Sequence, residues 1–237
     1  RKERMTQMAC HGRGLGQVVH APILAIDELG LTPRDTVWVQ GVGCSSRITY
    51  STWVGDNVDA HHGRIFAVAT GLKMARPDMN FVLFTGDGDC GAIGGNHFIH
   101  ACRRNLDVTA ILFNNGIYGM TGGQLGPTTP PQARTTTSPY GNTEPPFNIP
   151  YLVAASGAVY LARWTALHVR RLEKSITEAL LKTGFSFIEV ISPCPTVYAR
   201  RNRLGSGLDL MRFYRDNSVT KNNIDTRECD IGFQEKL

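Results

Sequence analysis

Four short apolar runs constrain the fold of this 237-residue chain more than any other feature of the sequence. They span residues 36–43, 81–84, 108–113 and 185–191. Each run is mostly non-alternating and leads into or is closely followed by glycine, asparagine or proline. Strands that are covered on both faces have this pattern, because every side chain along them is buried. The runs therefore predict buried strands of a parallel sheet.

Between these runs lie segments with helical spacing of their apolar residues. They predict helices over residues 61–75, 95–105 and 165–183. The third has a leucine- and isoleucine-rich face and is followed by Gly184, which is a common residue just past a helix end. Alternating strands and helices form right-handed βαβ units. We therefore predict an α/β fold with a parallel sheet flanked by helices.

The length of the chain suits one α/β domain, which we place at residues 1–205. Residues 122–150 are rich in Thr, Pro and Gly and lack periodicity, so they predict a long loop that is functional or disordered. The polar residues 206–237 are interpreted as an extension that contacts a partner or is weakly ordered.

Composition excludes some classes of protein. The chain is 42% hydrophobic and 19% charged, and it contains no apolar run long enough for a membrane span. No apolar stretch follows the basic N-terminus, so we expect a cytoplasmic protein without a secretory signal. The net charge of +5 fits a surface with spare basic residues, an acidic partner or a phosphate-bearing ligand. Nucleic acid is not expected, because no basic stripe with interleaved aromatics occurs.

The sequence Gly86-Asp87-Gly88-Asp89 follows the second predicted strand, and Asn114-Asn115 follows the third. Loops at the carboxyl ends of neighbouring parallel strands face a common crevice. An Asp and an Asn from these loops offer the hard oxygen ligands that Mg²⁺ prefers, and Mg²⁺ readily takes others from phosphates. Alone, the first motif would be interpreted as an ordinary Asp-Gly turn. The pair predicts a site for Mg²⁺ and a diphosphate.

This pairing resembles the thiamine-diphosphate enzymes, and longer motifs resemble one family among them. They are residues 41–47, 62–64, 94–100, 103–105, 114–124, 127–130 and 192–196, and the resemblance extends over about residues 8–215. Together they look like the β subunit of 2-oxoacid:ferredoxin oxidoreductases, most of all the 2-oxoglutarate branch.

The resemblance implies a set of site residues. Mg²⁺ would be held by Asp87, Asn115 and the carbonyl of Ile117. The cofactor would be lined by Cys44, Ser45, Ser46, His62, Gly86, Gly88, Asp89, Ile117, Tyr118, Gly119, Met120 and Thr121. Alternatives remain: the two serines could cap a helix or turn, and one of His61 and His62 could be a surface residue. Arg47 is a candidate for the substrate carboxylate, or a surface arginine.

The chain has six cysteines, and without a secretory signal a disulfide framework is not expected. The family resemblance implies a [4Fe–4S] cluster on Cys10, Cys44 and Cys194, but Arg13 stands where the fourth cysteine belongs. Arginine is a poor ligand, because its guanidinium is protonated and has no lone pair to give. Three outcomes are therefore left open. The cluster has another group such as His11 as its fourth ligand, a different site replaces it, or the cluster is absent. Cys90, Cys102 and Cys229 are interpreted as packing or tail residues.

The function implied is CoA-dependent oxidative decarboxylation of a 2-oxoacid, expected to be 2-oxoglutarate, with electrons passing to ferredoxin, or the reverse CO₂-fixing reaction. The glutamate that activates the thiamine ring is not found here, so we expect an α subunit, in an αβ or (αβ)₂ assembly. Two alternatives are a non-oxidative decarboxylase or synthase subunit and a cofactor-binding subunit without redox turnover.

The roles of two further groups have alternatives. For His97 and His100 we favour packing over metal binding. Arg200, Arg201 and Arg203 could contact CoA phosphates or ferredoxin, or form a solvated basic face.

Overall fold

The computed structural model describes residues 10–228 and shows a six-stranded sheet in which all neighbouring strands are parallel. The strand order is β2-β1-β3-β4-β8-β7. Their bounds are β1 Thr36–Gln40, β2 Asn57–Asp59, β3 Asn80–Gly86, β4 Val108–Asn114, β7 Tyr160–Thr165 and β8 Phe185–Ile191. A small antiparallel pair, β5 Ile117–Tyr118 and β6 Gln124–Leu125, lies apart from the sheet. The predicted α/β class is confirmed.

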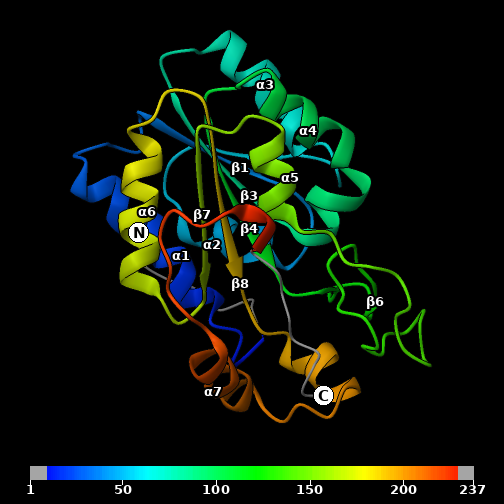
Figure 1. Ribbon diagram of the computed structural model, residues 1–237. Coiled ribbons are helices and arrows are strands. Elements are labelled where there is room, and N and C mark those ends of the chain that lie inside the picture. Colours follow the sequence, from blue (N-terminus) through cyan, green and yellow to red (C-terminus); the bar gives the residue numbers. More distant parts are fainter. Residues whose placement is uncertain (1–9, 229–237) are drawn as a thin grey trace.

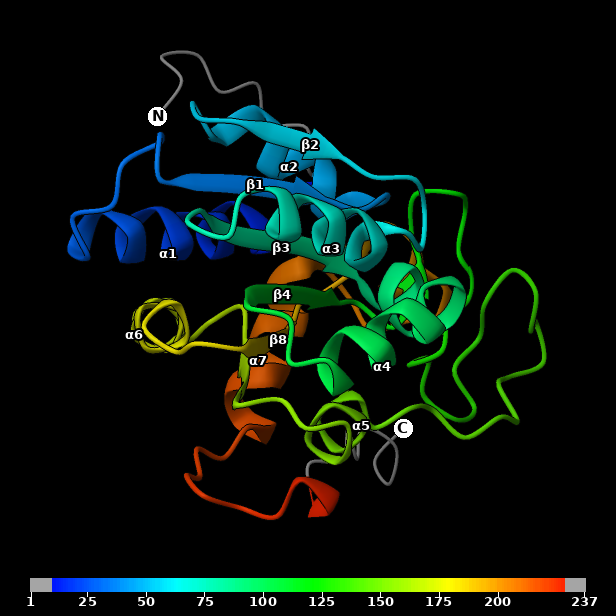
Figure 2. The ribbon, with the colours of Figure 1, turned by 90° about the horizontal axis from the view of Figure 1, so that it is seen from above.

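Helices cover both faces of the sheet (Figures 1 and 2). One face packs against α3 Ile65–Ala75, α4 Gly95–Arg103 and α5 Ile149–Ala155. The opposite face packs against α1 Leu15–Glu28 and α6 Val169–Leu180. The strands supply alternate residues to the two cores, as the two-residue period of a strand requires: Val82 and Phe84 face α1 and α6, whereas Phe81 and Leu83 face the other side.

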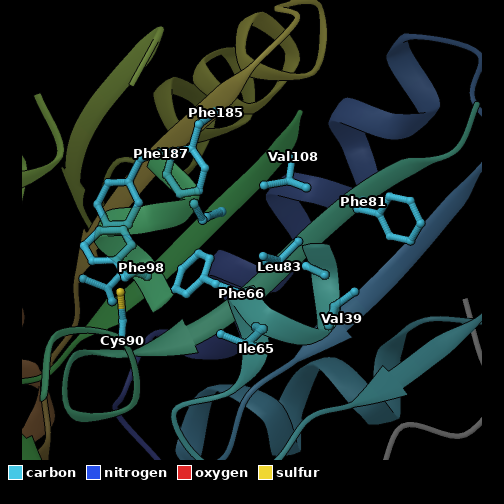
Figure 3. Packing of buried hydrophobic residues seen from close by; sticks show 14 of the residues in the cluster. Val39, Ile65, Phe66, Phe81, Leu83, Cys90, Phe98, Val108, Phe185 and Phe187 are labelled. Carbon is cyan, nitrogen blue, oxygen red and sulfur yellow. The ribbon is translucent and has the colours of Figure 1, made fainter. Parts of the chain in front are cut away.

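An aromatic cluster fills the core beneath α3 and α4 (Figure 3). The ring of Phe98 lies 5.1 Å from that of Phe66 and 5.3 Å from that of Phe187, in tilted geometries. Such pairs stabilise a core beyond the area that they bury. Cys90 and Cys102 are buried in the same cluster, so their interpretation as packing residues is confirmed. Cys229 lies outside the described residues.

Several elements differ from the sequence prediction. The four predicted strands all form, but β2, β7, α1, α2 and α5 were not predicted. The helix expected from residue 165 begins at Val169, because residues 160–165 pair with β8 as strand β7. Helix α1 contains Pro22, a residue that normally argues against a helix interior. Packing of its apolar face against α6 outweighs that preference.

The first part of the segment after Gly205, for which contact with a partner or weak order is expected, is helical. It forms helix α7, Gly207–Asn217, which begins with a capping box between Ser206 and Asp209 and buries Leu210 and Tyr214. A capping box of this kind satisfies two backbone N–H groups of the first turn.

Residues 126–148 contain no helix or strand, but hydrogen bonds fix their path. The Asn142 side chain donates to the carbonyls of Thr129 and Glu144, at 2.8 and 2.9 Å.

Within residues 10–228, no helix has the length and apolar character needed to cross a membrane.

Candidate functional site

The carboxyl ends of β1, β3 and β4 meet at one edge of the sheet, where they form a cleft of about 150 Å³. After β1 the chain adds β2 on one side and then crosses to add β3 on the other. Ligands of open α/β sheets bind at such a switch point. The cleft is lined by Leu15, Val42, Gly43, Cys44, Ser45, His62, Gly86, Asp87, Gly88, Asp89, Phe113, Asn115, Ile117, Tyr118, Gly119, Met120 and Thr121. The structure thus brings together the predicted cofactor-lining residues, with the exception of Ser46.

Asp87 lies buried at the end of β3, with its carboxylate facing the loop after β4. Burial raises its pKa to about 6, because the ionised form loses its water, although hydrogen bonds from Thr128 and from backbone amides act in the opposite direction. Asn115, which is partly exposed in the same cleft, turns its amide oxygen toward the N–H of Ile117 at 3.3 Å. A carboxylate held in so dry a place favours a bound cation, which offsets the cost of burying its charge.

A buried network that the sequence analysis missed supports Asp87. The hydroxyl of Thr128 lies 2.9 Å from Asp87 Oδ2 and 2.8 Å from Asn114 Oδ1, and its single proton can serve one acceptor at a time. Asn114 Nδ2 donates to Glu189 Oε1 at 2.7 Å, and Arg163 Nε donates to Glu189 Oε2 at 2.6 Å. Glu189 is fully buried in β8. A glutamate within a strand of mostly apolar residues was the sequence signal for this network.

The N-terminus of α2, Cys44–Thr52, opens onto the cleft at Gly43, Cys44 and Ser45. Backbone N–H groups at a helix start attract anions such as phosphate. The Ser45 hydroxyl is buried and has no hydrogen-bond partner within residues 10–228. An unsatisfied buried hydroxyl is costly, so a ligand oxygen here would complete the site. The Ser46 hydroxyl instead donates to the Gly43 carbonyl at 2.8 Å and caps the helix, which was the alternative considered for it.

His62 is oriented by Asp89. The buried Asp89 carboxylate lies 2.7 Å from His62 Nδ1 and accepts hydrogen bonds from the Gly63 N–H at 2.6 Å and the Thr85 hydroxyl at 2.7 Å. With the carboxylate as acceptor, Nδ1 carries the proton and Nε2 is left for a ligand. Asp89 therefore acts on the cleft mainly through His62, rather than as an exposed acid.

The other side of the cleft is formed by residues after β4. The Tyr118 hydroxyl donates to the Gly88 carbonyl at 3.2 Å, and its ring packs directly on Gly88. A Cβ at position 88 would lie 2.2 Å from a ring atom of Tyr118, so only glycine fits there. Met120 and Thr121 are exposed at the rim.

We expect the His62→Ala substitution to weaken thiamine diphosphate binding roughly 10- to 100-fold, the value of one hydrogen bond to a charged group. The measurement is a calorimetric titration with thiamine diphosphate in the presence of Mg²⁺, made on the complex with the expected α subunit. The neighbouring His61→Ala is the matched control, because His61 is exposed and outside the cleft lining. Equal effects of the two substitutions would contradict this role.

The three cysteines proposed as cluster ligands are brought into one region around Arg13. The Arg13 guanidinium is buried and donates to Cys194 Sγ at 3.2 Å. The Sγ atoms of Cys44 and Cys194 both lie beside Gly119. Cys10 lies near Thr196, with 3.6 Å between Sγ and Oγ1. Across residues 10–228, no set of three His, Cys, Asp or Glu side chains is arranged to hold a metal ion.

Several other predicted residues lie outside the cleft lining. Arg47 is an exposed residue of α2, and the exposed arginines Arg200, Arg201 and Arg203 follow the turn after Cys194. His97 and His100 lie on α4, where Arg103 Nε donates to His100 Nδ1 at 3.4 Å.

Comparison with known proteins agrees with this geometry. Residues 41–190 match the family model described as the C-terminal TPP-binding domain of thiamine pyrophosphate enzymes. The chain is 48% identical to the 2-oxoglutarate synthase subunit KorB of Methanocaldococcus jannaschii, over 94% of this chain and 82% of that protein. It is also 48% identical to KorB of Archaeoglobus fulgidus, over 100% of this chain and 87% of that protein.

A solved structure is similar as well. The 2-oxoglutarate:ferredoxin oxidoreductase of Magnetococcus marinus, with 2-oxoglutarate, coenzyme A and succinyl-CoA bound, matches with a TM-score of 0.83 and 34% identity. The match covers 96% of this chain and 76% of that one.

The parallel sheet, the Asp87–Asn115 pair at its carboxyl edge and the family match define a thiamine-diphosphate-binding domain. Within that class, the chain belongs to the β subunits of the 2-oxoacid:ferredoxin oxidoreductases, of the 2-oxoglutarate synthase type.

Proposed function

We propose that this β subunit binds thiamine diphosphate through Mg²⁺ and acts with an α subunit in the CoA-dependent oxidative decarboxylation of a 2-oxoacid, expected to be 2-oxoglutarate, or in the reverse CO₂-fixing reaction. The observation that carries the proposal is the placement of Asp87 and Asn115 at the carboxyl ends of neighbouring strands, opposite the start of α2. This arrangement supports the proposal, because oxygen atoms of a kind suited to Mg²⁺ and N–H groups of a kind suited to a diphosphate line one cleft.

Different residues of the chain would hold the metal, bind the diphosphate and cover the cofactor. Asp87, Asn115 and the carbonyl of Ile117 would hold Mg²⁺, while the start of α2, the Ser45 hydroxyl and His62 would bind the diphosphate. Thiamine diphosphate, when bound, supplies the carbon nucleophile and the electron sink for decarboxylation. Tyr118, Gly119, Met120 and Thr121 would cover the cofactor and exclude water. Arg47 remains a candidate for a substrate carboxylate, through two parallel hydrogen bonds.

The α subunit is required in this proposal, because no glutamate occurs among the described residues that line the cleft. Residues 122–150 are the proposed contact surface. Tyr140 in this segment is 99% exposed and Phe147 is 52% exposed, and exposed aromatics are enriched where proteins associate. The relatives are subunits by name, which supports a partner subunit, and the assembly that we propose is αβ or (αβ)₂.

Ferredoxin, CoA and a 2-oxoacid are the proposed external partners. CoA and 2-oxoglutarate are bound in the Magnetococcus marinus enzyme, whose name also includes ferredoxin. The net charge of +5 suits an acidic protein partner or a phosphate-bearing ligand. Arg200, Arg201 and Arg203 offer such a ligand an exposed basic face. Five free thiols among the described residues are compatible with a reducing cytoplasm.

The test is an assay of the complex assembled with its α subunit. We expect 2-oxoglutarate to give CoA-dependent release of CO₂ and reduction of an added electron acceptor, and the β subunit alone to give neither. CO₂ release without reduction of any acceptor would favour the non-oxidative alternative. Cofactor binding without any turnover, for a panel of 2-oxoacids, would favour a subunit that only binds the cofactor.

A further inference from the structure

Arg13 occupies the position from which the family resemblance expects a fourth cysteine ligand, three residues after Cys10. Its side chain does not turn to solvent. Only 3% of the residue is exposed, and Nη2 donates to Cys194 Sγ at 3.2 Å. The guanidinium therefore lies inside the thiol site, between the side chains that a cluster would need.

Gly119 shows how little room the site contains. A Cβ added to this glycine would lie 3.0 Å from Arg13 Nη2, 3.5 Å from Cys194 Sγ and 3.6 Å from Cys44 Sγ. The guanidinium and two thiols thus surround the same point of the backbone. Four irons and four sulfides could enter only if the Arg13 side chain were expelled from its buried place.

The chemistry of the Arg13 side chain opposes a cluster as well. A guanidinium is always protonated in proteins, because its charge is delocalised over three nitrogens. Arg13 therefore has no lone pair to give to iron, and its guanidinium already occupies the space beside the sulfurs of Cys194 and Cys44. His11, the other candidate for a fourth ligand, is exposed.

We propose that this β subunit holds no iron–sulfur cluster at Cys10, Cys44 and Cys194, and that Arg13 fills the site as a buried cation hydrogen-bonded to thiol sulfur. Arg13 would thus take the place of the metal as the positive charge among the three sulfurs. The residues present do not fit the cluster that the family resemblance implies. The function proposed above does not require electrons to pass through these three cysteines. This inference depends on the site alone and holds whichever 2-oxoacid is the substrate.

The first test measures iron and acid-labile sulfide in the αβ complex, purified without oxygen, and in its Cys10→Ala variant. The difference between the two reports iron that needs this site, whatever iron the α subunit contributes. We expect a difference below about half an iron per β chain, against about four for a complete cubane. A difference of about three or four irons, with a cluster signal after dithionite reduction, would overturn the proposal.

The second test restores the missing ligand with Arg13→Cys, and Arg212→Cys, on the exposed face of α7, is the matched control. We expect Arg13→Cys to gain about four irons per β chain and a paramagnetic signal on reduction, and Arg212→Cys to gain none. A folded Arg13→Cys complex that stays free of additional iron would show that Arg13 is not what excludes the cluster. If that variant does not fold, the first test still decides the proposal.

Discussion

The Asp87→Asn substitution is expected to weaken Mg²⁺-dependent binding of thiamine diphosphate by at least roughly 100-fold, which corresponds to about 2.8 kcal/mol. The carboxylate is the one charged side chain among the three proposed metal ligands, and an amide offers Mg²⁺ no negative charge. Calorimetric titration of the αβ complex with the cofactor, with and without Mg²⁺, measures the effect. Asp216→Asn is the control, since Asp216 is an exposed residue of α7 that pairs with Arg215.

This loss of binding is expected without loss of folding. Burial holds the pKa of Asp87 at about 6, so the ionised side chain is unfavourable in the folded protein when no cation is present. An uncharged amide of the same shape avoids that cost. The thermal midpoint of the cofactor-free variant should therefore be no lower than that of the wild type at pH 7.5. Unchanged cofactor affinity in the variant would remove Asp87 from the metal site.

The second large effect is expected at Glu189, where Ala should destabilise the fold by about 3–5 kcal/mol. Glu189 is fully buried and accepts hydrogen bonds from Arg163 and Asn114, so its removal leaves a partly buried cation and a buried amide without this acceptor. For a domain of this size the loss corresponds to a fall of roughly 10 °C in Tm, measured by thermal unfolding.

Glu178→Ala provides the matched control for Glu189→Ala. Glu178 is an exposed acidic residue whose carboxylate accepts a hydrogen bond from the Tyr160 hydroxyl at 2.8 Å. Solvent can replace that contact, so we expect little change in Tm. Glu189→Ala should in addition weaken cofactor binding, because Asn114 and Thr128 connect Glu189 to Asp87. A Tm shift as small as that of the control would contradict the structural role of this network.

The sequence by itself determined the parts of this protein that depend on local pattern. Non-alternating apolar runs predicted four strands, since a strand covered on both faces needs apolar side chains at nearly every position. The motifs Gly86-Asp87-Gly88-Asp89 and Asn114-Asn115 follow two neighbouring predicted strands. Because the carboxyl ends of parallel strands lie at the same edge of a sheet, these motifs predicted that Asp87 and Asn115 lie close together. Motif resemblance then indicated the family.

Only the tertiary structure decided the rest. Helix α1 forms despite Pro22 because α6 covers its apolar face, and β7 forms because it extends the sheet beside β8. The connection from Glu189 through Asn114 and Thr128 to Asp87 joins residues that are far apart in the chain, so no local pattern reveals it. The position of Arg13 is the clearest case: the family resemblance implies a cysteine at this position, but only the structure shows that the arginine side chain is buried beside Cys194.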